Sequence, residues 1–426
     1  MQAPEWMRDA VLYQLNTRQF SPEGTFRAAQ AQLPRLQALG VDVIWLMPIH
    51  PIGELNRKGT LGSPYAVRDY YGVNPEFGTM ADLRAFVDEA HRLGMHVILD
   101  WVANHTSWDN PLYRDHPDWY ERDWDGAPRP TLWFDWHDII DLDYSRPEVR
   151  QYMTQAMAYW VREADVDGFR ADVAGLVPID FWDNVRSELD AIKPVFMLAE
   201  WEYPELHRGA FDATYAWGWF EALHRIAQGR GDVGGLVGWL SWDASAWPHE
   251  AMRLMGTQNH DKNSWDGTEY ELFGPALDNV TVLNFVARGL PMIYNGQEGG
   301  NNRRLEFFER DPIIWPATEH PNAAMFRRLI RFRDAHPALH NGRWGAPMIP
   351  VVNSAHPHVL SFVRQQGDDK VFGIFNMSAA PRDVRFTDGP FAGHYVDYAD
   401  ASRVTVDAET VITIPAWGHR VLTSAP

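Results

Sequence analysis

Short apolar runs alternate with amphipathic stretches along the chain from residue 11 to about residue 340. Apolar runs of about four to eight residues predict buried strands, and apolar residues spaced about three or four apart predict helices. The predicted strands are Val11–Leu15, Val43–Met47, Met95–Val102, Gly168–Ala171, Val195–Ala199, Ala213–Tyr215, Leu254–Thr257 and Pro291–Tyr294. The predicted helices are Phe26–Leu39, Met80–Leu93, Glu148–Ala164, Phe181–Ile192, Leu277–Ala287 and Ala324–Ala335. Eight strands joined by crossover helices predict an α/β fold, the (β/α)8 TIM barrel.

Two stretches depart from this alternation. Residues 105–144 are rich in Trp, Asp, Pro and Tyr and show no helical period, so we expect a short inserted subdomain over the barrel mouth. After residue 341, short alternating segments predict a C-terminal antiparallel β-sandwich. These segments are Val359–Val363, Lys370–Phe375, Arg382–Phe386, Val404–Val406 and Thr410–Ile414. The predicted domains are a barrel formed by 1–104 and 145–340, a subdomain at 105–144 and a sandwich at 341–426.

Composition narrows the class of function. The chain has 426 residues, 45% of them hydrophobic, which is enough for a large buried core. The net charge of −19 comes without a basic patch, so we expect no nucleic-acid partner. With no cysteine, disulfides, thiol catalysis and cysteine-ligated metals are excluded. We find no apolar run that would span a membrane and no signal pattern in MQAPEWMRDA, which favours a cytoplasmic protein that does not bind membranes.

Twenty tryptophans are unusual for a chain of this length. Sugar rings have apolar C–H faces that pack against aromatic rings, so this richness in tryptophan hints at carbohydrate binding. We expect most of the tryptophans to lie in the core and only a few to contact sugar.

Ionisable residues follow the predicted strands at the end where a barrel of this type carries its active site. The third strand ends at Asp100, the fourth at Asp172, the fifth at Glu200 and the seventh at Asp261. One acid at a strand end is usually a loop cap or a salt-bridge partner. Four such segments in one barrel are harder to explain in that way and predict a common pocket.

The chemistry that needs such a set is cleavage of a glycosidic bond. A retaining enzyme uses two carboxyl groups about 5–5.5 Å apart, one as nucleophile and one as general acid and base. Adjacent barrel strands lie about 4.8 Å apart, so Asp172 and Glu200 are suitably placed. Arg170 points the same way as Asp172, because strand side chains repeat every second residue, and its charge favours an ionised Asp172.

These segments resemble the signatures of the alpha-amylase family, the family 13 glycoside hydrolases. The four main motifs are Asp100–His105 (DWVANH), Gly168–Asp172 (GFRAD), Ala199–Glu200 and Asn259–Asp261 (NHD). Three weaker matches are Ser63–Tyr70, Asp141–Tyr144 and Gly289–Glu298. The motifs occur in the family's order from about residue 10 to residue 340. The C-terminal region resembles the family only in its position and in its short alternating segments.

The resemblance implies a role for each matching residue. Asp172 matches the nucleophile, Glu200 the general acid and base, and Asp261 the third acid, which binds sugar hydroxyls. The remaining matches are Arg170, which orients the nucleophile, His105 and His260, which hydrogen-bond the sugar, and Tyr65, its stacking platform. Trp201 follows the acid and either lines the leaving-group side or packs in the barrel.

The chain also departs from the family pattern. Asn104 matches a residue that often binds calcium, but the histidine expected four residues after the nucleophile is Leu176 here. We therefore expect no required metal or cofactor, with calcium as a possible ligand. Many starch-cleaving members carry Lys-His where Gly175-Leu176 stands, and Asp172-Val-Ala resembles neopullulanase-like enzymes.

Together these features predict a retaining hydrolase of α-1,4-glucosidic bonds in maltooligosaccharides or starch-like α-glucans. Two alternatives use the same scaffold: an α-1,6-active glucosidase, and a transglycosylase or isomerase that excludes water. A third is a non-catalytic carbohydrate-binding protein, which would be expected to have lost one of its carboxylates. The sequence leaves the oligomeric state open.

Overall fold

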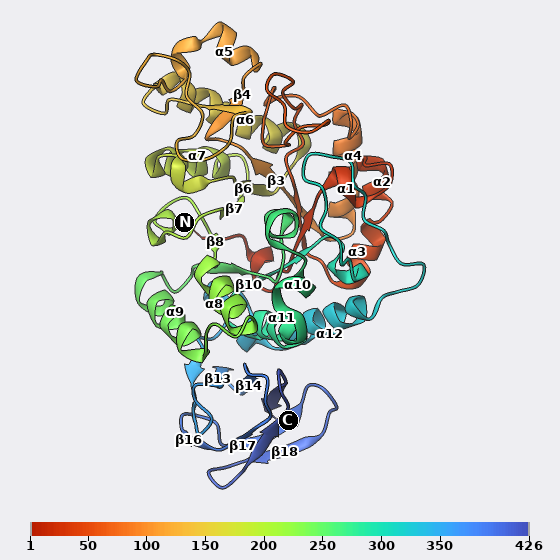
Figure 1. The fold of residues 1–426 in the computed structure, drawn as a ribbon, viewed down its shortest axis with the longest axis vertical. Coiled ribbons are helices and arrows are strands. Elements are labelled where there is room, and N and C mark those ends of the chain that lie inside the picture. Colours follow the sequence, from red (N-terminus) through yellow and green to blue (C-terminus); the bar gives the residue numbers. More distant parts are fainter. Residues whose placement is uncertain (1, 425–426) are drawn as a thin grey trace. The chain divides into compact units, whose positions relative to one another are not determined.

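The computed structural model describes residues 2–424 and contains a closed eight-stranded barrel (Figure 1). The strand order around the barrel is β1-β10-β9-β8-β7-β6-β3-β2. The strands are β1 (Leu12–Leu15), β2 (Val43–Leu46), β3 (His96–Trp101), β6 (Gly168–Ala171), β7 (Phe196–Ala199), β8 (Ala213–Tyr215), β9 (Met252–Met255) and β10 (Leu290–Tyr294). The predicted barrel is confirmed, and seven of its eight strands lie within one residue of the predicted bounds.

The seventh strand was predicted wrongly as Leu254–Thr257, whereas β9 begins two residues earlier. The cause is Arg253, whose charge interrupts the apolar run in the sequence. In the structure its guanidinium lies 3.9 Å from the ring centroid of Trp247 and forms a 2.9 Å ion pair with Asp243. Buried in this way, an arginine occupies a strand position that the sequence pattern assigns to an apolar residue.

Twelve α-helices are described between residues 2 and 424. They are α1 (Thr17–Phe20), α2 (Phe26–Gln30), α3 (Leu33–Leu39), α4 (Met80–Arg92), α5 (Pro111–Asp115), α6 (Pro147–Ala164), α7 (Ile179–Asp190), α8 (Trp217–Ala227), α9 (Val233–Ala246), α10 (Glu269–Phe273), α11 (Leu277–Val286) and α12 (Pro321–Ala335). The helix predicted over Phe26–Leu39 is divided into α2 and α3, because Pro34 has no N–H to continue the ladder. Among the described residues, none of the helices combines the length and apolar character that crossing a membrane requires.

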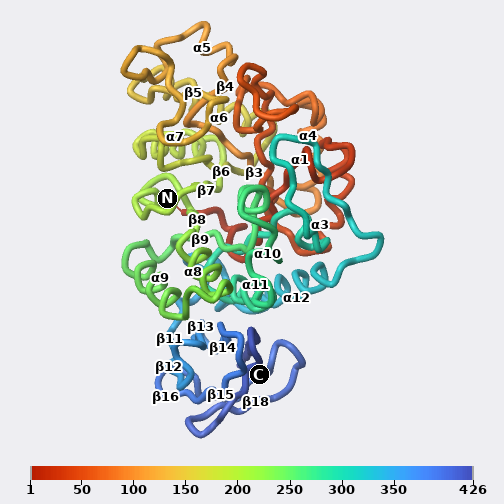
Figure 2. The backbone as a smooth tube through the Cα atoms, in the orientation of Figure 1, coloured from red at the N-terminus to blue at the C-terminus, as the bar shows by residue number. Residues whose placement is uncertain are grey.

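The chain divides into two compact units. The first consists of Leu12–Tyr215 with Tyr294–Ala323 and the residues up to Pro4. Within it, α4 packs on β3 and α6, and α6 packs on α7; in Figure 2 the tubes of α6 and α7 run close to β6. The second unit consists of Glu5–Val11, Ala216–Ile293 and the chain from Ala324.

The first unit contains a segment that leaves the barrel after β3. β4 (His105–Ser107) pairs antiparallel with β5 (Ile139–Asp141), and α5 lies between them in the sequence. A small apolar cluster of Ile52, Ala66 and Ile139 packs with Trp136 at the base of this segment. The segment matches the expected excursion after the third strand, and its exact limits as a domain stay a prediction.

The C-terminal part of the second unit is built from antiparallel strands. Its main sheet has six strands in the order β11-β13-β14-β20-β17-β18, and β12-β16 and β15-β19 form two-stranded sheets. The bounds are β11 (Ile349–Pro350), β12 (Val352–Asn353), β13 (Val359–Gln366), β14 (Asp369–Asn376), β15 (Arg382–Val384), β16 (Phe386–Asp388), β17 (Gly393–Asp397), β18 (Arg403–Val406), β19 (Ile412–Ile414) and β20 (His419–Ser424). The segment Arg382–Phe386, predicted as one strand, is divided between β15 and β16, which pair in different sheets.

A buried arginine ties this sheet to the helical part of the same unit. Arg364, on β13, is fully buried and donates to the carbonyl oxygens of Ala287 at 2.8 Å, Ala346 at 2.9 Å and His340 at 3.1 Å. These carbonyls lie at the end of α11 and in the connection to the sheet, where regular secondary structure leaves them without strand or helix partners. A buried carbonyl that loses its donor lowers the free energy of unfolding by about 1–3 kcal/mol. Arg364 therefore avoids this loss at several carbonyls at once.

We expect Arg364→Leu to lower the free energy of unfolding by about 3 kcal/mol or more, because several buried carbonyls lose their donor at once. The measurement is the urea midpoint of unfolding followed by circular dichroism. Gln365→Leu, at the exposed neighbouring position of the same strand, serves as the control and should shift stability by less than about 0.5 kcal/mol. Equal effects of the two substitutions would contradict the role given to Arg364.

Candidate active site

The strand register of the barrel places Asp172 and Glu200 side by side. Ala171, the last residue of β6, pairs with Ala199, the last residue of β7. The N–H of Glu200 donates to the carbonyl of Ala171 at 2.9 Å, so the pairing continues beyond the strands. Since paired strands lie about 4.8 Å apart, the two acids leave neighbouring strands at the same level.

One guanidinium connects the carboxylates of this site. Nη1 of Arg170 donates to Oδ1 of Asp100 at 2.8 Å and to Oδ1 of Asp172 at 2.9 Å. Nη2 of Arg170 lies 3.0 Å from Oε1 of Glu200. Arg170 and Asp100 are fully buried, and Asp172 is nearly so. The structure thus brings together four residues that the sequence placed at the ends of three different strands.

Aromatic side chains complete the surroundings of this cluster. The hydroxyl of Tyr65 and the indole N–H of Trp45 each donate to Oδ2 of Asp100 at 3.0 Å. The ring centroid of Trp45 lies 4.9 Å from Cζ of Arg170, and the hydroxyl of Tyr215 lies 3.3 Å from its Nε. Sequence reasoning missed Trp45 and Tyr215. Tyr215 ends the sixth predicted strand, so the strand-end argument would have found it if extended from acids to every polar residue.

Val173, the residue after Asp172, has a strained backbone. Its φ of 37° and ψ of 46° lie in the left-handed region, which β-branched residues rarely enter. In this conformation its N–H donates to Oε2 of Glu200 at 2.7 Å. One oxygen of Glu200 therefore faces Arg170 and the other faces a backbone N–H, so the strain helps to fix the orientation of this carboxyl.

Burial and mutual repulsion make these acids hard to ionise. Burial raises the pKa of Asp172 well above its ordinary value, the negative charge of Glu200 raises it further, and Arg170 opposes both effects. Burial also raises the pKa of Asp100, again against the effect of Arg170. Arg170 therefore favours an ionised Asp172, as its position predicted, but desolvation and the crowded carboxylates have the larger effect on the pKa.

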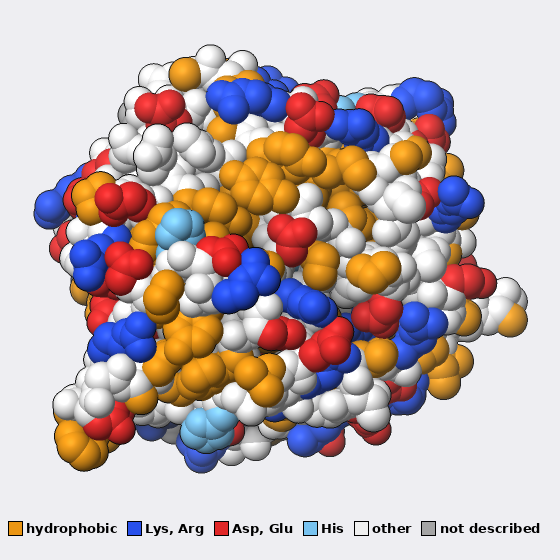
Figure 3. All heavy atoms as spheres, turned by 90° about the horizontal axis from the view of Figure 1, so that it is seen from above, with side chains coloured by type: hydrophobic (Ala, Val, Ile, Leu, Met, Phe, Trp, Pro, Cys, Tyr) orange, Lys and Arg blue, Asp and Glu red, His pale blue; other side chains and the backbone are white. Residues whose placement is uncertain are grey.

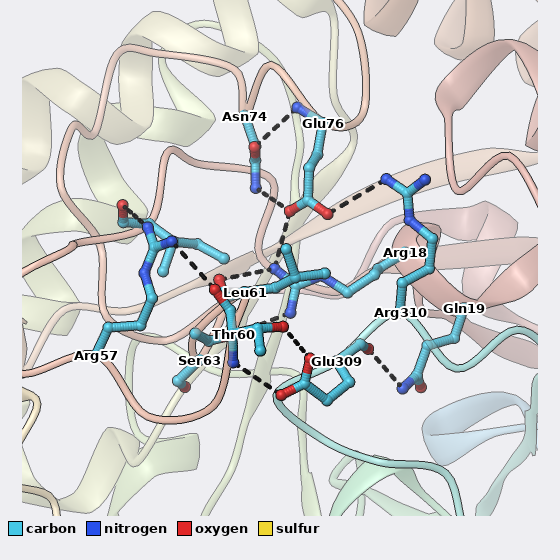
Figure 4. A network of polar contacts seen from close by, with 12 residues as sticks. Arg18, Gln19, Arg57, Thr60, Leu61, Ser63, Asn74, Glu76, Glu309 and Arg310 are labelled. Carbon is cyan, nitrogen blue, oxygen red and sulfur yellow. Dashed lines mark hydrogen bonds and ion pairs between the residues drawn. The ribbon is translucent and has the colours of Figure 1, made fainter.

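A polar network fixes the loop that carries Tyr65 (Figure 4). The guanidinium of Arg18 donates to the carbonyl of Gly62 at 2.9 Å and forms a 3.0 Å ion pair with Glu76. The N–H of Thr60 donates to Oε1 of Glu309 at 2.8 Å, and the Thr60 hydroxyl donates to Oε2 of the same carboxylate. These contacts hold the loop from both sides, so Tyr65 approaches Asp100 from a rigid support.

Tyr65 and His105 lie beside each other at the edge of the cluster. The Tyr65 ring stacks on Phe307, with centroids 6.2 Å apart and planes at 19°. The backbone of Tyr65 hydrogen-bonds the imidazole of His105, and burial lowers the pKa of His105 to about 4. His105 is therefore neutral near pH 7. The backbone of Tyr65 already hydrogen-bonds its ring, and its Nδ1 lies 3.1 Å from the amide nitrogen of Asn104.

Trp201 packs against Gly175, which has no side chain. A Cβ atom added to Gly175 would lie 2.2 Å from the Trp201 indole, which leaves no room for a side chain at that position. The carbonyl of Trp201 accepts from the N–H of Tyr215 at 3.1 Å, and its ring meets Tyr203 edge-on at 5.8 Å. Trp201 is half-buried.

His260 and Asp261 belong to the second compact unit, where they follow β9. Nε2 of the buried His260 lies 3.3 Å from Oδ2 of Asp261, whose side chain is 41% exposed. Asn259 accepts the N–H of Lys262 at 2.7 Å through its side-chain oxygen. The motif thus forms a local turn that exposes one carboxylate, and its role in binding sugar stays a prediction.

The residues around Asn104 satisfy one another by hydrogen bonds. Its amide N–H donates to Oδ1 of Asp141 at 3.0 Å, and the same oxygen accepts the hydroxyl of Thr131 at 2.5 Å. The guanidinium of Arg129 lies 4.0 Å from the other oxygen of Asp141. Calcium needs about six to eight oxygen ligands, and Oδ1 of Asp141 is already occupied by two donors. This donor set does not fit calcium, and independence from metals stays a prediction.

The inserted segment exposes large apolar side chains to solvent. They are Trp124, Leu132, Trp133 and Phe134. Figure 3 views the molecule from above, and on this face hydrophobic side chains gather in groups between scattered acidic and basic ones. Apolar surface between polar groups suits sugars, which combine C–H faces with hydroxyl edges.

Comparisons with known proteins agree with this geometry. A family model described as the alpha-amylase catalytic domain matches residues 16–139 and 131–194. The noncanonic maltogenic alpha-amylase AmyB from Thermotoga neapolitana is 30% identical with a TM-score of 0.90, over 99% of this chain and 100% of that one. An alpha-amylase from Lactobacillus plantarum is 32% identical with a TM-score of 0.87, again over 99% of this chain and 100% of the other.

A relative of greater length also aligns. Alpha-amylase MalA of Haloarcula japonica is 28% identical over 439 residues, which is 97% of this chain and 63% of that protein. This chain therefore spans less than two thirds of that relative. Because both solved structures are at least 30% identical and align over their whole length, the chain belongs to the alpha-amylase family of glycoside hydrolases.

Proposed function

We propose that the protein is a retaining hydrolase of α-1,4-glucosidic bonds in maltooligosaccharides or related α-glucans. One observation carries the proposal: Asp172 and Glu200 follow paired residues of β6 and β7 and contact the same buried guanidinium. This places two carboxyls on neighbouring strands, as attack on one side of a glycosidic bond and protonation of its oxygen require.

The proposed reaction has two steps. Asp172 attacks the anomeric carbon while Glu200 donates a proton to the leaving oxygen, which gives a covalent glycosyl-enzyme and a free sugar end. Glu200 then takes a proton from water, and the resulting hydroxide displaces Asp172. Arg170 and the N–H of Val173 orient these carboxyls through the contacts at 2.9, 3.0 and 2.7 Å. Two inversions at the same carbon give net retention.

Substrate positions are assigned from the surrounding side chains. Tyr65 provides a flat surface for the sugar at the cleavage site. We assign His105 to the same sugar on the strength of the family motif. We assign Asp261 and His260 to sugar hydroxyls on the strength of the family motif. Trp201, packed on Gly175, is placed on the leaving-group side. Support for maltooligosaccharides comes from the name of the relative AmyB, a maltogenic alpha-amylase.

We expect Asp172→Asn and Glu200→Gln each to lower kcat on maltoheptaose by about 10⁴-fold or more, because each removes one half of the carboxyl pair. Asp180→Asn, an exposed acid on α7, is the control and should retain activity. Proton NMR of a fresh wild-type digest should show the α-anomer first. Full activity in either variant, or β-anomer as the first product, would refute the assignment. Products longer than the substrate would favour transglycosylation.

The acid limb of the pH profile should depend on Asp100. Asp172 must be ionised to attack, and its raised pKa places loss of kcat/KM above the ordinary range of aspartic acid. Asp100→Asn removes a negative charge that disfavours ionisation and leaves Arg170 more available to Asp172. We therefore expect the acid limb to move to lower pH by about one unit. A limb that stays in place or moves to higher pH would contradict this coupling.

Gly175→Ala should act through Trp201. Because the added Cβ overlaps the indole, we expect the ring to move and KM for maltoheptaose to rise about tenfold, with kcat little changed. Trp201→Ala should give a similar increase. The test is the double variant: if Gly175 acts only by supporting Trp201, adding Gly175→Ala to Trp201→Ala should have almost no further effect. Additive effects would show that Gly175 contributes in another way.

A further inference from the structure

A second cluster of charged and imidazole side chains lies at the other end of two catalytic strands. His91 is near the end of α4, His96 begins β3, and Asp167 directly precedes β6 (Figure 1). The catalytic candidates follow the opposite ends of these strands. With a rise of about 3.3 Å per residue, Asp167 and Asp172 lie about 16 Å apart along the strand, so the cluster is separate from the site already described.

The three side chains converge on one point. Nε2 of His91 lies 2.7 Å and Nδ1 of His96 lies 3.5 Å from Oδ2 of Asp167. The three donor atoms are all within 4.8 Å of one another. Ligands of a tetrahedral zinc ion, each about 2.0–2.1 Å from the metal, are about 3.4 Å apart. Rearrangements of about an ångström, within side-chain freedom, would bring these atoms to that spacing.

The surrounding charges favour a cation. Oδ2 of Asp165 lies 3.6 Å from Nδ1 of His91, so the nitrogen not facing Asp167 has a carboxylate partner. This second carboxylate adds negative charge beside the imidazole. Nζ of Lys193 binds Asp165 at 2.5 Å and Oδ1 of Asp167 at 3.1 Å, which leaves Oδ2 facing the two imidazoles. Two carboxylates and one ammonium give a net charge of −1 with neutral imidazoles.

The cluster is partly open to solvent but firmly anchored. The side chains of His91 and His96 are 26% and 27% exposed, so an ion and a water ligand can reach them. The carboxylate of Asp167 is 9% exposed, and its Oδ2, which faces the two imidazoles, also accepts the N–H of Val97 at 2.8 Å.

We propose that His91, His96 and Asp167 bind Zn²⁺, with water as the fourth ligand. The bound ion links α4, β3 and β6 at the end of the barrel away from the catalytic acids. Its effect is on stability, because a ligand that binds only the folded chain stabilises it. Two nitrogen ligands and one carboxylate favour zinc or cobalt over calcium, which prefers oxygen alone.

The test uses the full chain stripped of metal with EDTA and then desalted. Zn²⁺ at about one hundred times its Kd should raise Tm by about 2 °C or more, and calorimetry should show one equivalent bound. Co²⁺ should give the intense visible absorption of a tetrahedral site. Ca²⁺ should leave Tm unchanged. Activity on maltoheptaose should be the same with and without Zn²⁺, which separates this proposal from the catalytic one.

Substitutions of single histidines test where the ion binds. His91→Gln and His96→Gln should each remove the Zn²⁺-dependent shift, whereas His224→Gln should keep it. His224 has one carboxylate neighbour, Glu221 at 3.9 Å, and so provides the control for weak surface binding. A shift that persists in the first two variants would assign zinc to other histidines and overturn the proposal. Absence of tetrahedral Co²⁺ bands in the wild type would overturn it without any variant.

Discussion

The site depends on one buried guanidinium shared by three carboxylates. Moving charges out of water costs several kcal/mol for each ion, and Arg170 recovers this only through close contacts with Asp100, Asp172 and Glu200. The cluster still has an excess of negative charge, which adds to burial in raising the pKa of Asp172. This excess disfavours the ground state and suits a reaction in which positive charge develops at the anomeric carbon. The same crowding therefore weakens the fold locally and supports the proposed chemistry.

Barrel geometry makes this crowding possible. Parallel pairing fixes Asp100 opposite Arg170 and places Asp172 and Glu200 after another matched pair. A shift of one residue in either strand would turn these side chains to the other face. Charges that repel one another are thus held by backbone hydrogen bonds that do not depend on them. The strained Val173 follows the same principle, because β6 ends just before it, a short 3-10 helix of Ala174–Leu176 follows it, and its N–H is held by Glu200.

Much of the fold and the core of the site could be predicted from the sequence, because strands and strand-end acids are local signals. Apolar runs gave seven barrel strands within one residue. Arg253 displaced the remaining one, the seventh along the chain, because its charge is neutralised by residues outside the strand. Trp45 and Tyr215 were missed for a related reason. Each contacts Arg170 from another strand, and nothing near it in the sequence indicates that contact. The pKa of Asp172 also could not be predicted, since it depends on burial as well as on neighbours.

The charged side chains at the two ends of β3 and β6 affect stability in opposite ways. At one end, Asp100 and Asp172 are held against repulsion and desolvation, and the strands must resist separation there. At the other end, Asp167 accepts hydrogen bonds from His91 and from the backbone N–H of Val97, which ties β6 to both α4 and β3. Neutralising contacts at this end stabilise the strand pair whether or not an ion is bound. A barrel that gathers like charges at one rim thus benefits from hydrogen bonds and ion pairs at the other, because rigid strands connect the two.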